Sequence, residues 1–360
     1  MTAKDNTFVA DLEEAKQQDA EAERFRLNAR VDEKTRELSA AKTLIRSLQS
    51  EVDRLAVVEN FLKTTSLNQE PNWCKPSKRK AKQEHGTVTL LLSDLHLDEV
   101  VRPEEMDGRN AFNREIAELR LKRVFEGLIE QTSHYHQGTI YDGCVVLLGG
   151  DMVSGAIHEE LRETNEYPVP ATIKHWTPLL AAGLNLLADA FGKVHVASVV
   201  GNHGRFTTKP RYKLRAFDNA DWLISALLAE RFATDSRFTF DVPEGTDAYV
   251  SVYDTRILLT HGDQASGGGG IGGIWPPIMR LKARKQANNT FDHMCIGHWH
   301  QFVHSQGITV NGSLKGYDEF ASGHNFAFEE PRQAMFIITP ERGITWPVEI
   351  FCGNRRQEGW

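Results

Sequence analysis

Five short clusters of Asp, His and Asn follow one another along the C-terminal three-quarters of this 360-residue chain. They are Asp94-Leu95-His96, Gly149-Gly150-Asp151, Gly201-Asn202-His203, His261-Gly262-Asp263 and Gly297-His298-Trp299-His300. Carboxylate and amide oxygens and neutral imidazole nitrogens are ligands for divalent metals. The clusters supply enough of them to hold two ions, and paired ions can clamp the attacking and leaving oxygens of a displacement at phosphorus. The spacing therefore predicts cleavage of phosphate esters.

The elements that position these clusters must end close to one another. Apolar runs of strand length at 87–93, 144–148 and 194–200 each lead into one cluster. Active sites of open α/β sheets collect beyond the carboxyl ends of their strands. In an extended backbone, side-chain alternation would place Asp94 and His96 on one face, and His298 and His300 would repeat that geometry. The two glycines before Asp151 allow the backbone to turn tightly there.

The rest of residues 87–360 alternates strand-like and helical patterns, which predicts an α/β domain. Helical periodicity is found at 115–131, 171–191, 219–231 and 277–285. Further strand-like runs lie at 238–242, 248–253, 257–260, 294–296, 302–304, 308–310 and 334–338.

Residues 1–66 have a different character, because residues 8–65 contain neither proline nor glycine. Apolar residues recur there with three-four spacing, as in the seam of a coiled coil. The a positions hold Val31, Leu38, Ile45 and Val52, and the d positions hold Leu27, Ala41, Leu48, Leu55 and Leu62. We expect a coiled coil that makes the protein a homodimer. The alternative is one amphipathic helix folded back onto the catalytic domain. Residues 67–86, which carry Lys78, Arg79, Lys80 and Lys82, are expected to form a basic flexible linker.

Composition narrows the class of protein. The net charge of −7 does not indicate a general nucleic-acid binder, although a local basic patch is compatible with it. No apolar run is as long as a membrane span, and the N-terminus lacks the apolar core of a signal peptide. The four cysteines form no CxxC pair, and Cys144 and Cys295 lie in apolar runs that predict buried free thiols. We expect a cytoplasmic protein with no membrane partner.

The order DxH, GD, GNH, H and GHxH resembles the signature of the calcineurin-like metallophosphoesterase family over residues 87–345. Some of the stretches that connect the motifs look similar to members encoded by phages and prophages. The resemblance implies an α/β sandwich of two sheets flanked by helices, preceded here by the helical coiled coil. It also implies two divalent ions, with Mn²⁺ favoured and Fe, Zn, Ni or Mg as alternatives.

The resemblance implies roles for individual residues. Asp94, His96 and His300 would hold the first ion, Asn202, His261 and His298 the second, and Asp151 would bridge both. His203 would lie outside the ligand set and protonate the leaving oxygen or contact the phosphate. Gly204 follows His203 where the family usually has an acid, so the group that orients His203 must come from elsewhere or be absent. Met152-Val153-Ser154 also departs from the usual acidic or polar residue after GD.

The segment 204–215 follows the ligand Asn202 and bears on the substrate. It holds five cations and two aromatic residues, namely Arg205, Phe206, Lys209, Arg211, Tyr212, Lys213 and Arg215. Cations can bind phosphates and aromatic rings can stack on bases, whereas a solvated loop with salt bridges has the same composition. With Arg205 as the candidate phosphate contact, we expect a phosphodiesterase or nuclease acting on DNA, RNA or nucleotides. The alternatives are a phosphomonoesterase, including a protein phosphatase, and a non-catalytic coiled-coil scaffold that binds metal.

Overall fold

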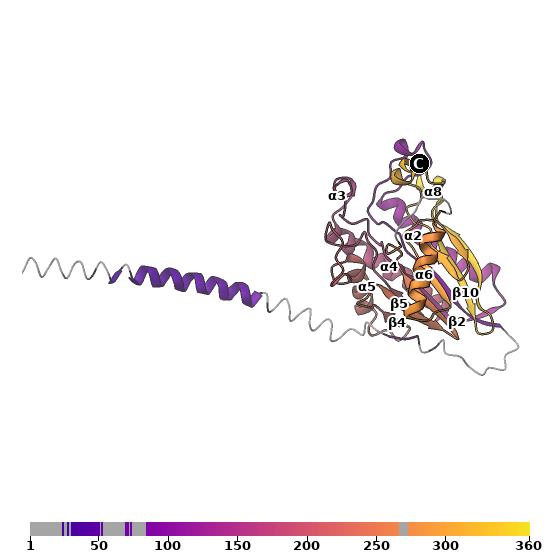
Figure 1. Cartoon of the computed structure of the whole chain (residues 1–360), viewed down its shortest axis with the longest axis horizontal. Coiled ribbons are helices and arrows are strands. Elements are labelled where there is room, and N and C mark those ends of the chain that lie inside the picture. The colour runs from indigo at the N-terminus through magenta and orange to yellow at the C-terminus, as the bar shows by residue number, and fades with distance from the viewer. Residues whose placement is uncertain are drawn as a thin grey trace, which may run out of the picture. The chain divides into compact units, whose positions relative to one another are not determined.

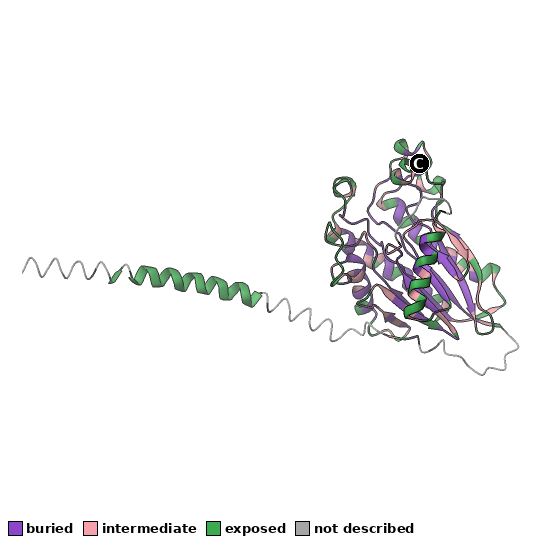
Figure 2. Ribbon diagram, viewed as in Figure 1, coloured by how far each residue is buried: buried purple, intermediate pink, exposed green. Residues whose placement is uncertain are grey.

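The computed structural model describes residues 24, 27–28, 30–50, 52, 69–71, 73, 84–265 and 273–360. The chain divides into two compact units, Met1–Thr64 and Thr65–Trp360. In the first unit, residues 30–50 form a helix whose side chains are exposed throughout (Figure 2). Its predicted seam residues Leu38, Ile45 and Leu48 are all exposed. Residues 1–23 and 53–66 of the predicted coiled coil lie outside the described residues, and its pairing with a second chain stays a prediction.

The second unit is built on a six-stranded sheet with strand order β11-β10-β1-β2-β3-β4 (Figure 1). Its strands are β1 (Glu84–Leu92), β2 (Thr139–Leu148), β3 (Val194–Ser198), β4 (Phe238–Asp241), β10 (Arg332–Thr339) and β11 (Gly343–Phe351). The four strands from β1 to β4 run parallel, and β10 pairs antiparallel with β1 on one side and with β11 on the other. Parallel pairing brings the carboxyl ends of β1, β2 and β3 to one edge of the sheet.

A second sheet has five strands in the order β5-β6-β7-β9-β8. They are β5 (Asp247–Val252), β6 (Thr255–Thr260), β7 (His293–Ile296), β8 (Val303–Ser305) and β9 (Ile308–Val310). Strands β6, β7 and β9 are parallel, so β6 and β7 also deliver their carboxyl ends to one edge.

Helices and sheets form four layers. The helices α2 (Arg114–Glu130), α4 (Val169–Phe191) and α5 (Ala220–Arg231) pack with the first sheet around Trp176 and Phe125. The two sheets share a separate core that includes Leu91, Val145 and Leu259. The helix α6 (Trp275–Asn288) covers the outer face of the second sheet through Ile278. The shorter helices described in this unit are η2 (Pro103–Met106), η3 (Gln131–Tyr135), α3 (Glu159–Thr164), α7 (Glu319–Gly323) and α8 (Arg355–Glu358).

This mixed α/β architecture of two sheets and helices is the class expected from the sequence. Alternation along the central strands explains it, because neighbouring residues of β1 face different cores: Leu90 packs against the helices and Leu91 against the second sheet. Cys144 and Cys295 are buried free thiols, as predicted. Among the described residues, no helix is long and apolar enough to span a membrane.

The N-terminal edge of this unit differs from the expected boundary at residue 87. Strand β1 begins at Glu84, inside the segment assigned to the linker. Earlier still, Gln69 donates its backbone N–H to the carbonyl of Phe240 at 2.7 Å, and Trp73 packs against the core between the sheets. Residues 74–83 of the predicted linker lie outside the described residues.

Candidate metal centre

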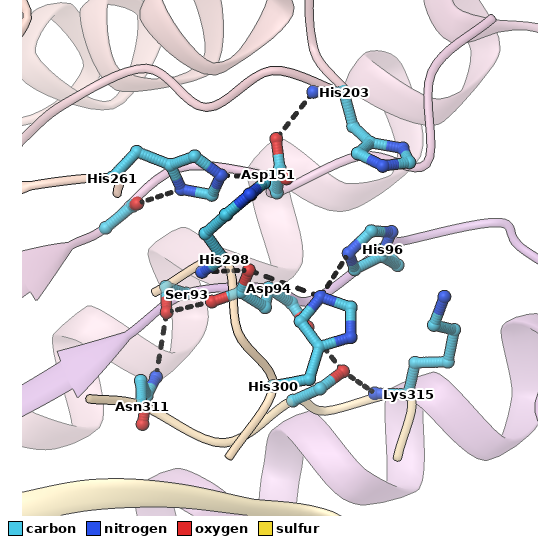
Figure 3. Close-up of polar contacts among 12 residues, drawn as sticks. Ser93, Asp94, His96, Asp151, His203, His261, His298, His300, Asn311 and Lys315 are labelled. Atoms are coloured by element: carbon cyan, nitrogen blue, oxygen red, sulfur yellow. Dashed lines mark hydrogen bonds and ion pairs between the residues drawn. The ribbon is translucent and has the colours of Figure 1, made fainter. Parts of the chain in front are cut away.

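The five clusters converge at the carboxyl ends of β1, β2, β3, β6 and β7 (Figure 3). Asp94, Asp151 and His261 are almost completely buried, whereas Asn202, His203, His298 and His300 are partly exposed. The centre therefore has a closed floor made by the two sheets and an accessible side lined by imidazoles.

One group of converging side chains consists of Asp94, His96 and His300. The two imidazole Nε2 atoms of His96 and His300 lie 3.1 Å apart. The Nε2 atom of His300 also lies 3.4 Å from Oδ1 of Asp94. Three ligand atoms thus point at one small volume from two segments, the loop after β1 and the loop after β7.

A second group consists of Asp151, His261 and His298. The Nε2 atom of His261 lies 3.0 Å from Oδ2 of Asp151 and 3.1 Å from Oδ1 of Asn202. The Nδ1 atom of His261 lies 2.8 Å from the carbonyl of Gly149. Because a carbonyl can only accept, Nδ1 donates its N–H there, and Nε2, which faces Asp151 and Asn202, is the nitrogen left to bind a metal ion.

His203, which was expected outside the ligand set, forms a third group with His96 and Asp151. Its backbone N–H donates to Oδ1 of Asp151 at 2.6 Å. Its Nδ1 lies 2.9 Å from the carbonyl of Ser154 and donates to it. The orienting partner of His203 is therefore a backbone carbonyl rather than a carboxylate, and the Nε2 atom remains available on the accessible side of the centre.

The backbone at the centre differs from the extended geometry that alternation predicted. Strand β1 ends at Leu92, and Asp94 and His96 have φ angles of 53° and 47°. Asp151, His298 and His300 also have positive φ. A left-handed conformation costs a residue other than glycine on the order of 1–3 kcal/mol, and such residues concentrate at functional sites. The expectation that these pairs lie in extended strands was wrong, because the chain turns sharply after each strand.

Close packing of the loops explains the glycines of the motifs. A Cβ on Gly201 would lie 2.1 Å from Oδ1 of Asp151, so only glycine lets this loop approach the carboxylate. A Cβ on Gly204 would lie 2.3 Å from Oδ1 of Asn219. Asn219 and Asp221 fill the space beside residue 204, which explains why no acid follows His203 in this chain.

Asp221 is a functional residue that sequence reasoning missed. This fully buried carboxylate accepts the backbone N–H groups of Asp151 at 2.9 Å, Met152 at 3.0 Å and Gly201 at 2.9 Å. It therefore ties the loop after β2 to the loop after β3. It lies inside the predicted helix 219–231, where a first-turn acid is common and gives no signal of such a role.

Asp94 is fixed by a second set of polar groups. Ser93 Oγ donates to Oδ2 of Asp94 at 2.5 Å, and Asn311 Nδ2 donates to Ser93 Oγ at 2.9 Å. The backbone N–H of His298 donates to Oδ1 of Asp94 at 2.9 Å. Ser93 adjoins a predicted ligand, whereas Asn311 is distant in sequence and had no motif to mark it.

The pKa values reflect burial and mutual charge. Burial acts to raise the pKa of Asp151, but the charges of His261 and His203 hold it well below its usual range. Burial acts to lower the pKa of His261, but the Asp151 charge and hydrogen bond raise it to about 10. Burial lowers the pKa of His96 to about 4, assisted by the charge of Lys315, and burial lowers the pKa of His298 to about 4, assisted by His261.

The donor set fits divalent metal ions. Carboxylate, amide and imidazole atoms converge at the centre. Among the described residues, no lysine or arginine forms an ion pair with Asp94 or Asp151, so the ion-pair partners of these two carboxylates are histidines. Asp151 shares one group with His96 and another with His261 and His298, which suits a ligand that reaches two ions. Mixed oxygen and nitrogen ligands are compatible with several transition metals.

Arg205, the predicted phosphate contact, donates to backbone carbonyls of its own segment. Its guanidinium reaches Asn202 at 2.8 Å, Thr207 at 2.9 Å and Thr208 at 3.0 Å. One guanidinium nitrogen of Arg215 donates to both carboxylate oxygens of Asp263, at 2.8 and 2.9 Å. In contrast, Tyr212 is 95% exposed, and Lys209, Arg211 and Lys213 are exposed as well. The loop is thus anchored at its base and presents cations and an aromatic ring at its tip.

Comparisons with known proteins give little further guidance. No protein-family model and no curated protein matches the chain. Similar solved structures include a single mutant of Vps29 from Entamoeba histolytica, with 13% identity over 73% of this chain and 98% of that one and a TM-score of 0.30. A predicted phosphoesterase from Streptococcus pneumoniae has 12% identity over 74% and 98%, with a TM-score of 0.27. Wild-type E. histolytica Vps29 complexed with zinc has 13% identity over 74% and 99%, with a TM-score of 0.28.

Proposed function

We propose that this protein is a phosphoesterase that uses two divalent metal ions, in agreement with its resemblance to the calcineurin-like family. The observation that carries the proposal is the position of Asp151, which converges with His96 on one side and with His261 and His298 on the other. Asp94 and His300 complete the first ion site, and Asn202 completes the second.

The chemistry follows from this arrangement. Divalent ions held by these residues would supply positive charge that neutralises the phosphate oxygens and lowers the pKa of a water nucleophile to near neutrality. Ser93 and the backbone N–H of His298 donate to Asp94, and Asp221 accepts from the backbone N–H of Asp151, so the candidate ligands are fixed before substrate arrives. His203, with Nδ1 committed to Ser154, would present a protonated Nε2 to the leaving oxygen and act as the general acid.

The substrate class that we favour is a phosphodiester in nucleic acid or a nucleotide. The exposed tip of the 204–215 loop supports it, because Lys209, Arg211 and Lys213 can bind phosphates beyond the cleaved one and Tyr212 can stack on a base. Arg205 would support this loop from its base rather than contact phosphate. A phosphomonoesterase and a metal-binding scaffold without activity are the competing functions.

A substrate panel with added Mn²⁺ tests the proposal. We expect turnover of bis(p-nitrophenyl) phosphate and cleavage of DNA or RNA oligonucleotides. Asp151→Asn is expected to lower both activity and metal affinity. Loss of a residue that only supports a metal ligand lowers them by ~10–100-fold, and loss of the ligand Asp151 itself should lower them further. The exposed Asp189→Asn serves as the matched control and should behave like wild type. Turnover of monoesters alone would show a phosphatase, and metal binding without any hydrolysis would show a scaffold.

A further inference from the structure

A buried carboxylate outside the five motifs lies behind the first metal ligands. Glu99 is 7% exposed, and its Oε2 atom lies 3.0 Å from Nδ1 of His96. This is an ion-pair distance, although the angles are not those of a hydrogen bond. Metal-bound imidazoles commonly use the nitrogen opposite the metal to contact a carboxylate, which fixes the ring. Glu99 stands at that position for His96.

Ser154 connects the same carboxylate to the second histidine. Its hydroxyl donates to Oε2 of Glu99 at 3.1 Å, and its carbonyl accepts from Nδ1 of His203 at 2.9 Å. The rings of His96 and His203 meet edge to face, with centroids 4.6 Å apart. Nδ1 of His96 therefore faces Glu99 directly, whereas Nδ1 of His203 is connected to it through Ser154, which is fully buried.

Lys315 pairs with the other oxygen of Glu99. Its ammonium lies 2.6 Å from Oε1 of Glu99 and 2.5 Å from Oδ2 of Asp318, and the residue is 3% exposed. Lysine is almost never buried this far unless it is paired. Asp318 in turn caps α7 by accepting the N–H of Ala321 at 2.8 Å. Glu99 thus has one oxygen anchored to a fixed cation and the other directed at His96 and Ser154.

We propose that Glu99, Ser154 and Lys315 form a brace that positions His96 for metal binding and His203 for proton transfer. The brace replaces the acid that is missing after His203, since Gly204 leaves no room for one. It makes two predictions with different readouts. Loss of the Glu99 charge weakens metal retention at the His96 side, whereas loss of the Ser154 hydroxyl misplaces His203 and leaves metal binding intact. The second prediction rests on the proposed phosphoesterase function.

The metal arm uses Mn²⁺ titration of the metal-free full-length chain by calorimetry. Glu99→Gln and Lys315→Met are expected to weaken one of the two Mn²⁺ sites by ~10–100-fold. Lys285→Met is the matched control, because Lys285 forms a similar ion pair with Asp247 at 2.7 Å in another part of the fold. Wild-type affinity at both sites in Glu99→Gln would overturn the positioning of His96.

The proton-transfer arm compares phosphodiesters with good and poor leaving groups. Ser154→Ala should bind Mn²⁺ like wild type and retain most p-nitrophenyl ester turnover. It should lose about 10-fold or more on the phenyl ester, because that leaving group depends on the general acid, which contributes roughly 10²–10⁴-fold. Thr132→Val removes a buried hydroxyl that donates to the Leu128 carbonyl of α2 and should leave both rates unchanged.

The outcomes separate the two proposals. Equal losses on both esters in Ser154→Ala would overturn the role of the brace in proton transfer, because a merely structural defect does not discriminate leaving groups. If Glu99→Gln fails to fold, Ser154→Ala still decides that role. Wild-type protein without turnover of either diester would overturn the proposed function, and the Mn²⁺ arm would then decide the brace alone.

Discussion

Individual residues of the centre are held by groups that no motif contains. Asp94 depends on Asn311 through Ser93, and the loops of Asp151 and Gly201 depend on Asp221. The motifs could be found from the sequence because ligand chemistry restricts residue type and spacing. The supporting residues could not, because any hydrogen-bonding side chain brought there by the fold can do their work. Asp221 is the clearest example for a test.

Replacing Asp221 with alanine is expected to lower the free energy of unfolding by about 3 kcal/mol or more, because three buried N–H groups lose their acceptor and each costs roughly 1–3 kcal/mol. Urea denaturation of metal-free protein measures this change. Asp235→Ala is the control, since Asp235 forms a partly exposed pair with Arg237 of the kind worth about 0–1 kcal/mol. Equal effects of the two substitutions would contradict the role given to Asp221.

At the scale of elements, the strands that lead into the motifs could be predicted directly, because each is an apolar run that ends at a polar cluster. The expected run 144–148 is the buried end of β2, and the helix 115–131 is α2 within one residue at each end. Strand β11 was not predicted. It contains Pro347, most of its residues are at least partly exposed, and within the described part of the chain it pairs only with β10 at the sheet edge. It therefore shows neither continuous burial nor clean alternation. Its register depends on β10, which a local pattern cannot reveal.

The exposed helix 30–50 carries the prediction of a homodimer. Leu48 occupies a d position of the heptad, and a lysine there would place a charge in the paired seam. We expect Leu48→Lys to halve the mass measured by light scattering and to leave bis(p-nitrophenyl) phosphate turnover unchanged. Ser50→Lys changes the outer f position and should keep the wild-type mass. A monomeric wild-type protein, or an unchanged mass in Leu48→Lys, would refute the coiled-coil dimer.

The second unit, Thr65–Trp360, is held together by buried polar contacts as well as by its apolar cores. Arg120 is fully buried and pairs with Glu358 of α8, and it also donates to the carbonyls of Leu314 and Lys315. Helix α8 is thereby fastened to the segment that carries the brace lysine. The α/β class could be predicted from the patterns of strands and helices. The pairing of Arg120 with Glu358 could not, because the two residues are 238 positions apart and no local pattern links them. Buried ionisable groups, charged or neutral, make the free energy of unfolding of the unit depend on pH.

Two buried histidines that belong to none of the five motifs determine the direction of a pH dependence. Burial lowers the pKa of His195 and of His293 to about 3, whereas in an unfolded chain a histidine titrates near 6.5. Between these values the unfolded chain takes up protons that the folded protein does not. The stabilising contribution is therefore complete above pH 6.5 and is lost as the pH falls towards 3.

His195→Gln should make the fall in unfolding free energy between pH 6.5 and 4 less steep than in wild type, by up to about 1.4 kcal/mol per pH unit. Glutamine does not titrate, and its amide can still contact Thr239, whose hydroxyl lies 2.9 Å from Nδ1 of His195. Urea denaturation of metal-free protein at a series of pH values measures the slope. His134→Gln, on the exposed end of η3, is the control and should reproduce the wild-type slope. A wild-type slope in His195→Gln would mean that His195 is protonated in the folded protein, and that the cross-strand contact with Thr239 tolerates an imidazolium inside the sheet.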